Sequence, residues 1–206
     1  MRVIAGEAKG RPLHAPRSSA VRPTSDKIKG ALFSMLESLL YSRRSAGEAE
    51  LGPSDVWDGL RWLDLYAGTG ALAIEALSRG AAWADLVEGN PAACRVIRRN
   101  LAETGLAARA HLFCQTVQAA LASDSVLLSR GGYDIIALDP PYDDPSVGSV
   151  LPLLSDSPLW RKGGLLAVEH SRRLPLAPEY GRLVLARDRT HGDTVLSVYV
   201  KQEATA

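Results

Sequence analysis

The sequence predicts an α/β protein with a doubly wound, largely parallel sheet. From residue 60 onward, short apolar strand patterns alternate with helix patterns, and this alternation is typical of such a sheet. The run at 133–138 is short and apolar, follows two glycines and therefore resembles a buried strand. With 206 residues, of which 46% are apolar, the chain has the length of one domain, or one domain with a small appendage.

The first 41 residues form that appendage in our prediction. Residues 2–5 and 11–15 are short strand-like pieces around a glycine-containing turn, so we expect a β-hairpin, with Pro12 confining its second piece to an edge. Thr24 is a good N-cap and Asp26 suits the first turn of a helix. Apolar residues then recur with helical spacing and predict an amphipathic helix; they are Ile28, Ala31, Leu32, Met35, Leu36, Leu39 and Leu40.

Residues 42–59 are polar, contain several glycines and a proline, and show no period, so we expect a surface loop. The main domain would then span residues 60–206. Its predicted strands and helices, in chain order, are strand 60–66, helix 71–79, strand 83–87, helix 91–104, strand 111–114, helix 117–122, strand 133–138 and strand 165–169. The last two pieces, 182–187 and 194–201, are joined by too few residues for a crossover helix and predict an antiparallel hairpin at the sheet edge, giving seven strands.

Charge is unevenly distributed along the chain. The formal net charge is +1, yet residues 1–44 hold nine Lys or Arg and only three acidic residues. This imbalance indicates an anionic partner bound at one end of the molecule, although a solvated terminus has the same composition. The candidate contacts are Lys9, Arg11, Arg17 and Arg22.

Several classes are disfavoured by composition. The chain has no run of about 18 apolar residues and begins without the apolar core of a secretory signal, so we expect no membrane span and a cytoplasmic location. Two cysteines, Cys94 and Cys114, are too few for a disulfide framework. The histidines show no metal-ligand spacing, so we expect no metal.

A glycine-rich turn connects the first main-domain strand to its helix. It runs from Asp64 through Tyr66, Ala67, Gly68, Thr69 and Gly70. The glycines permit a tight turn and close approach of a ligand at a helix N-terminus, and Glu88, which ends the next strand, suits a ribose diol. The glycine spacing also matches a relaxed form of the dinucleotide-binding fingerprint, so NAD is a second candidate cofactor. The early Asp64, however, suits a cofactor with a positively charged methionine part, and Gln115 and Thr116 after the third strand are placed to meet an adenine.

The second candidate site follows the strand at 133–138. Asp139, Pro140, Pro141 and Tyr142 end the strand, because proline has no N–H for a ladder. The turn offers a carboxylate, a proline carbonyl and an aromatic ring, which match the two N–H bonds and flat face of a nucleobase amine. A plain strand-ending turn is the alternative. Both candidate sites lie at carboxyl ends of strands and would face one another if the first and fourth strands were neighbours.

Taken together, these motifs resemble the class I, Rossmann-like methyltransferases that methylate amino groups. The N-terminal pattern Met1 to Gly6 with Lys9 to Arg11, the Arg22-Pro23-Thr24 segment, and Glu169-His170-Ser171 are similar to the RsmD family. The resemblance implies S-adenosylmethionine as cofactor and methylation of the exocyclic N2 of a guanine in small-subunit ribosomal RNA. We expect the RNA substrate to be part of a small-subunit particle and the enzyme to be a monomer. An adenine-N6 methyltransferase, an NAD-dependent oxidoreductase and a non-catalytic RNA-binding protein remain alternatives.

Overall fold

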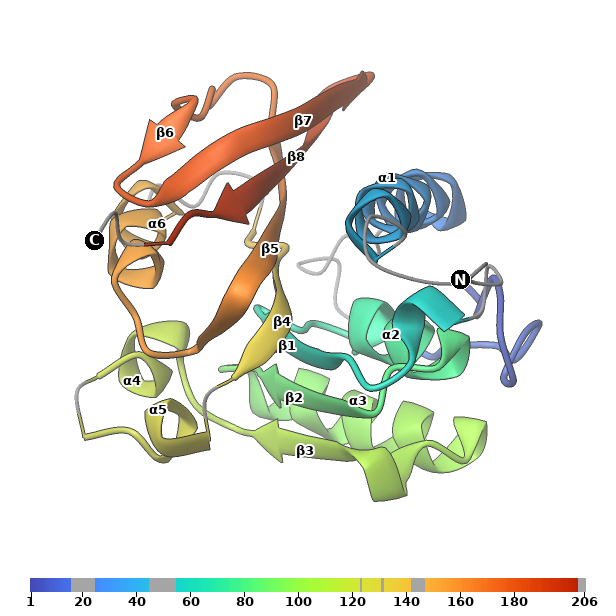
Figure 1. Cartoon of the computed structure of the whole chain (residues 1–206). Helices are drawn as coiled ribbons and strands as arrows, with labels where there is room; N and C mark the ends of the chain where they lie inside the picture. The colour runs from blue at the N-terminus through green and yellow to red at the C-terminus, as the bar shows by residue number, and fades with distance from the viewer. Residues whose placement is uncertain (16–24, 45–54, 123, 131, 142–146, 204–206) are drawn as a thin grey trace.

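A computed structural model describes residues 1–15, 25–44, 55–122, 124–130, 132–141 and 147–203. Within these residues the chain forms an eight-stranded sheet with the order β3-β2-β1-β4-β5-β8-β7-β6 (Figure 1). The parallel part contains β1 (Arg61–Leu65), β2 (Trp83–Val87), β3 (Ala110–Phe113), β4 (Tyr133–Leu138) and β5 (Trp160–Ser171). The antiparallel part contains β6 (Glu179–Tyr180), β7 (Leu183–His191) and β8 (Thr194–Lys201).

The predicted doubly wound sheet with an antiparallel C-terminal edge is therefore confirmed. The sheet has one strand more than predicted, because the two residues of β6 pair with β7. The expected connection between the last two strands is mostly strand as well, since β7 extends to His191.

Helices cover both faces of the sheet (Figure 1). One core cluster contains residues of α1 (Asp26–Arg44), α2 (Ala71–Arg79) and α3 (Pro91–Thr104). The other contains residues of α4 (Val117–Ala120), α5 (Val126–Arg130) and α6 (Val147–Ser155). The sequence did not predict α5 and α6. Short 3₁₀ helices are η1 (Asp55–Trp57) and η2 (Ala107–Arg109).

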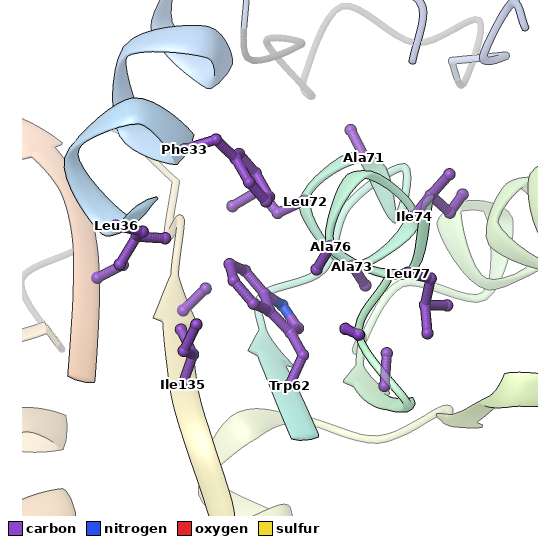
Figure 2. Close-up of a cluster of buried hydrophobic side chains, with 14 of the residues drawn as sticks. Phe33, Leu36, Trp62, Ala71, Leu72, Ala73, Ile74, Ala76, Leu77 and Ile135 are labelled. Carbon is purple, nitrogen blue, oxygen red and sulfur yellow. The ribbon is translucent and has the colours of Figure 1, made fainter. Parts of the chain in front are cut away.

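Helix α1 packs on the sheet through an aromatic cluster (Figure 2). The rings of Phe33 and Trp62 stack with centroids 5.5 Å apart, and Trp57 lies 5.3 Å from Phe33. Trp57 Nε1 also donates to a carboxylate oxygen of Glu37 at 3.0 Å, so the end of the predicted loop 42–59 is anchored on the helix. The start of that loop was placed too early, because α1 continues to Arg44.

The N-terminal residues form the predicted hairpin only in part: Val3 N donates to Arg11 O, Gly10 N to Val3 O and Leu13 N to Met1 O. Among residues 1–15 there is a single antiparallel bridge, between Arg2 and Pro12. The backbone N–H groups of Ile4 and Ala5 instead donate to the carboxylate of Glu75 in α2, at 2.8 and 3.0 Å. The backbone pairing is therefore short, and beyond it hydrogen bonds to a helix side chain take the place of a longer ladder.

Two further contacts fix this N-terminal segment on α2. Ser78 Oγ accepts a hydrogen bond from Ala8 N and donates one to Ala5 O. Lys29 of α1 pairs with Glu75 at 3.0 Å, and both side chains are fully buried. The segment is thus part of the packed structure, while the division of the chain at residues 41 and 59 stays a prediction.

The cap that the sequence assigned to Thr24 lies outside the described residues; within them, Ser25 Oγ accepts a hydrogen bond from Ile28 N at 3.2 Å. Within the described parts of the chain, no helix is both long and apolar enough to span a membrane.

Candidate active site

The turn between β1 and α2 has the close-packed backbone expected of a ligand-binding turn. Tyr66 has φ 63°, Gly68 φ 56° and Gly70 φ 77°, conformations that glycine adopts at least cost. A Cβ added to Gly70 would lie 3.3 Å from Leu86 Cδ2, which leaves little room for a side chain. Ala67 N donates to Val87 O, so the turn is held against the end of β2.

Asp64 lies beneath this turn and is 1% exposed. Its Oδ2 accepts a hydrogen bond from Ala73 N at 3.1 Å, whereas Oδ1 is buried and accepts none from the described residues. Burial raises the pKa of the Asp64 carboxyl well above its usual range, and the charges of Asp139 and Glu88 raise this pKa further. A buried acceptor without a donor fits a cationic group supplied by a ligand.

Glu88 joins the same turn from the end of β2. Its two carboxylate oxygens accept hydrogen bonds from Gly68 N and Asn90 N, both at 2.7 Å. Because each carboxylate oxygen has two lone pairs, these bonds leave capacity for a diol. The structure therefore places Asp64, the glycine turn and Glu88 together, as the sequence predicted.

The residues after β3 adjoin this group. A Cβ on Gly89 would lie 3.6 Å from Thr116 Cα, so the loops after β2 and β3 are in contact. Thr116 Oγ1 accepts a hydrogen bond from Ala119 N and caps α4. Gln115, half-buried, precedes it. Their position beside Glu88 agrees with the predicted adenine contact, which itself stays a prediction.

The Asp-Pro-Pro turn follows β4, and β4 pairs directly with β1: Asp64 is in register with Ala137 and Leu65 with Leu138. The condition set by the sequence, that the first and fourth strands be neighbours, is met. Asp139 and Pro140 line a pocket with the end of β5; its other lining residues are Pro141, Val147, Glu169, His170, Ser171, Leu174 and Leu176. Tyr142 lies outside the described residues.

Comparison with known proteins identifies the family. A family model described as "Conserved hypothetical protein 95" matches residues 1–200. Ribosomal RNA small subunit methyltransferase D of Escherichia coli K12 is 28% identical over 98% of this chain and 90% of its own length. YlbH of Bacillus subtilis, named as a candidate rRNA methyltransferase, is 34% identical over 98% of this chain and all of its own length. The chain belongs to the RsmD family of methyltransferases.

Solved structures agree with this RsmD assignment. A candidate methyltransferase from Escherichia coli, yhhF, has a TM-score of 0.77 and 27% identity, with 98% of both chains covered. A Thermus thermophilus protein has a TM-score of 0.74 and 29% identity, covering 96% of this chain and 98% of its own. A Salinibacter ruber RNA methyltransferase, solved with S-adenosyl-L-homocysteine, shares the fold at 16% identity and a TM-score of 0.61.

In this RsmD-family chain, His170 has a structural environment. Its Nδ1 lies 3.1 Å from the carbonyl oxygens of Ser171 and Leu174, and its Nε2 lies 3.0 Å from Ser197 Oγ. Burial lowers its pKa, which favours the neutral ring. His170 thus joins β5, the turn after it and β8, and both ring nitrogens are engaged.

The predicted RNA-contact residues are only partly described. Lys9 and Arg11 are exposed on the N-terminal segment that packs against α2, whereas Arg17 and Arg22 lie outside the described residues. Asn100 of α3 connects this segment to the glycine-rich turn after β1: it exchanges hydrogen bonds with the His14 backbone and donates to Thr69 O at 2.9 Å.

Sequence reasoning did not assign Glu169 or Ser171 of β5 to the candidate site. Glu169 and Ser171, at its carboxyl end, line the pocket beside Asp139. The signal was present, because carboxyl ends of adjacent parallel strands share one edge of a sheet. Within the described residues, no three His, Cys, Asp or Glu side chains could hold a metal.

Proposed function

We propose that this protein transfers a methyl group from S-adenosylmethionine to the exocyclic N2 amino group of a guanine in small-subunit ribosomal RNA. The observation that carries the proposal is the adjacency of β1 and β4, which brings the buried, incompletely bonded Asp64 carboxyl next to the Asp-Pro-Pro turn. The relatives named as rRNA methyltransferases support the substrate class.

The cofactor is held by the turn after β1 and its neighbours. Asp64 binds the methionine ammonium, directly or through water, and Glu88 accepts the ribose hydroxyls. The backbone from Tyr66 to Gly70, with Ala67 and Thr69 between them, lines the cofactor, and Gln115 and Thr116 contact the adenine. The bound sulfonium supplies an activated methyl group, so the protein contributes position and electrostatics.

The acceptor amine is held by Asp139 and Pro140. A guanine amino lone pair is delocalised into the ring, and hydrogen bonds from its two N–H groups to the Asp139 carboxylate and the Pro140 carbonyl localise it toward the methyl group. The amine nitrogen gains the methyl, the electron pair of the broken sulfur–carbon bond stays on sulfur, and Asp139 accepts the amine proton. Tyr142 stacks on the extruded base, returning about 1–3 kcal/mol against a flipping cost of a few kcal/mol.

The RNA is held by the basic residues of the N-terminal part. Lys9, Arg11, Arg17 and Arg22 neutralise phosphates, residues 1–41 form the RNA-contact region, and residues 60–206 form the catalytic domain. We expect the enzyme to act as a monomer on an assembled small-subunit particle in the cytoplasm, without a metal.

The decisive variant is Asp139→Ala. We expect it to lower methyl transfer by about 10²-fold or more, because the amine loses its charged acceptor, while cofactor affinity stays within about twofold. Tritiated S-adenosylmethionine with small-subunit RNA and particles measures transfer, and calorimetry measures cofactor binding. Loss of cofactor binding together with activity would instead assign Asp139 a role in folding.

Nucleoside analysis of the same product distinguishes the alternatives. N2-methylguanosine supports the proposal, whereas N6-methyladenosine would assign the chain to the adenine-N6 enzymes. Calorimetry with NAD in place of S-adenosylmethionine tests the oxidoreductase alternative. A methyltransferase should bind S-adenosylmethionine and not NAD, whereas an oxidoreductase should bind NAD and not S-adenosylmethionine.

A further inference from the structure

The sheet register places Glu169 next to Asp139. Leu138 of β4 is paired with Val168 of β5, and Ala137 with Ala167, so the following residues, Asp139 and Glu169, continue the two strands side by side. Adjacent strands lie about 4.8 Å apart, and alternate side chains point to one face. Asp139 and Glu169 therefore continue the face of Ala137 and Ala167, which is the face covered by α1 and α2.

Asp139 and Glu169 both line one pocket, together with the polar residues His170 and Ser171. His170 uses both ring nitrogens within the protein, and Ser171 Oγ accepts from Arg173 N. The Oε2 atom of Glu169 is buried, and leucine, valine and proline side chains form much of the remaining wall. The pocket thus suits a flat ligand whose edge presents hydrogen-bond donors.

Guanine has such an edge and adenine does not. In guanine, the amino group N2 adjoins N1–H, a second donor, whereas the amino group of adenine adjoins N1 with a bare lone pair. A carboxylate placed beside the amine acceptor therefore attracts guanine and repels adenine. Extending the proposed function, on which this step rests, we propose that Glu169 accepts the N1–H hydrogen bond of the target base and is the residue that selects guanine.

The matched probe is 2-aminopurine, which retains the 2-amino group but has a lone pair at N1. After the wild-type enzyme has been used to map the methylated guanine, 2-aminopurine is introduced there by ligation into the RNA, in reconstituted particles where these are required. Wild-type protein, Glu169→Gln and the control Glu179→Gln are compared for kcat/KM on both substrates. Glu179 is exposed on β6, away from the pocket lining.

We expect wild type and Glu179→Gln to prefer guanine strongly, and Glu169→Gln to reduce the guanine to 2-aminopurine ratio by about tenfold or more, because a glutamine amide can donate to a bare N1. The loss of the guanine O6 affects all three proteins alike. A structural role for Glu169 would lower both rates equally and leave the ratio unchanged.

The outcomes are separable from those of the proposed function. If wild type methylates no guanine amine, the proposed function fails and Glu169 has no guanine to select. If wild type forms N2-methylguanosine but Glu169→Gln keeps the wild-type ratio, the role of Glu169 is overturned and the proposed function stands. Cofactor affinity by calorimetry, expected to be unchanged in Glu169→Gln, shows whether the site remains folded.

Discussion

At the scale of single residues, the proposed cofactor role of Asp64 makes its protonation state testable. Its pKa in the folded protein is raised by burial, so the folded state binds this proton more tightly than the unfolded chain. Folding stability from this group therefore falls as pH rises from the unfolded pKa through the raised folded pKa. A ligand ammonium beside Oδ1 favours the ionised carboxylate and draws the proton off.

Cofactor affinity should accordingly depend on pH. We expect the affinity for S-adenosylmethionine to increase as the pH rises above the ordinary range of a carboxyl, while the ligand amine stays protonated, and to level off once Asp64 is ionised. Asp64→Asn should bind weakly with little pH dependence, while the exposed control Asp58→Asn keeps the rise. Calorimetry over this range measures both; a persistent rise in Asp64→Asn would contradict the assignment.

At the scale of elements, the N-terminal segment depends on one glycine for its contact with α2. Gly6 has φ +80°, and a Cβ there would lie 1.7 Å from Ser78 O. Gly10 has nearly the same conformation, φ +85°, but a Cβ there meets nothing within 4 Å. Substituting both glycines therefore distinguishes the cost of backbone strain, which the two positions share, from the cost of a steric clash, which only Gly6 has.

Gly6→Ala should destabilise the protein more than Gly10→Ala. Each substitution carries the left-handed backbone cost of about 1–2 kcal/mol, and Gly6→Ala adds the displacement of the segment from α2. We expect a difference of about 2 kcal/mol or more in the free energy of unfolding, measured by urea denaturation. Equal losses in the two variants would show that the segment is not tightly docked in solution.

At the scale of the whole molecule, the charge asymmetry gives a test of the proposed RNA contact. Lys9→Ala with Arg11→Ala should weaken binding to small-subunit RNA and reduce the slope of log affinity against log salt by about 0.7–0.9 for each lost phosphate contact. Lys162→Ala is the control, because Lys162 is 83% exposed and outside the N-terminal segment. Filter binding across a salt series measures the slope, and an unchanged slope would exclude this segment as the RNA contact.

Local signals account for what the sequence predicted well. The main-domain strands and helices follow from short-range patterns and end at residues with a clear capping role; for example, Asn90 accepts from Ala92 N at the start of α3. Both halves of the candidate site could be proposed from the sequence because each lies in a motif with its own strand and turn. The pairing of β1 with β4 makes the two motifs neighbours. The sequence alone could give this pairing only as a condition.

The misses have physical causes as well. Helix α6 has apolar residues with helical spacing, but Pro152 lies inside it, and a proline within a segment argues against a helix there. The two N-terminal pieces pair with each other over only a few residues, and Ile4 and Ala5 instead donate to Glu75 of α2, some 70 residues away, which no local pattern reveals. Glu169 was noticed only as part of a family resemblance, since its proposed role depends on the pairing of β4 with β5.

The fixation of the first residues on α2 has a consequence for synthesis of the chain. Ile4 and its partner Glu75 are 71 positions apart, so this N-terminal segment leaves the ribosome before α2 and cannot dock until α2 has been made. At translation speeds of about 5–20 residues per second, this delay is roughly 4–14 s. A nascent chain stalled before residue 75 should therefore remain open to protease at its N-terminus, whereas one stalled well beyond α2 should be protected there.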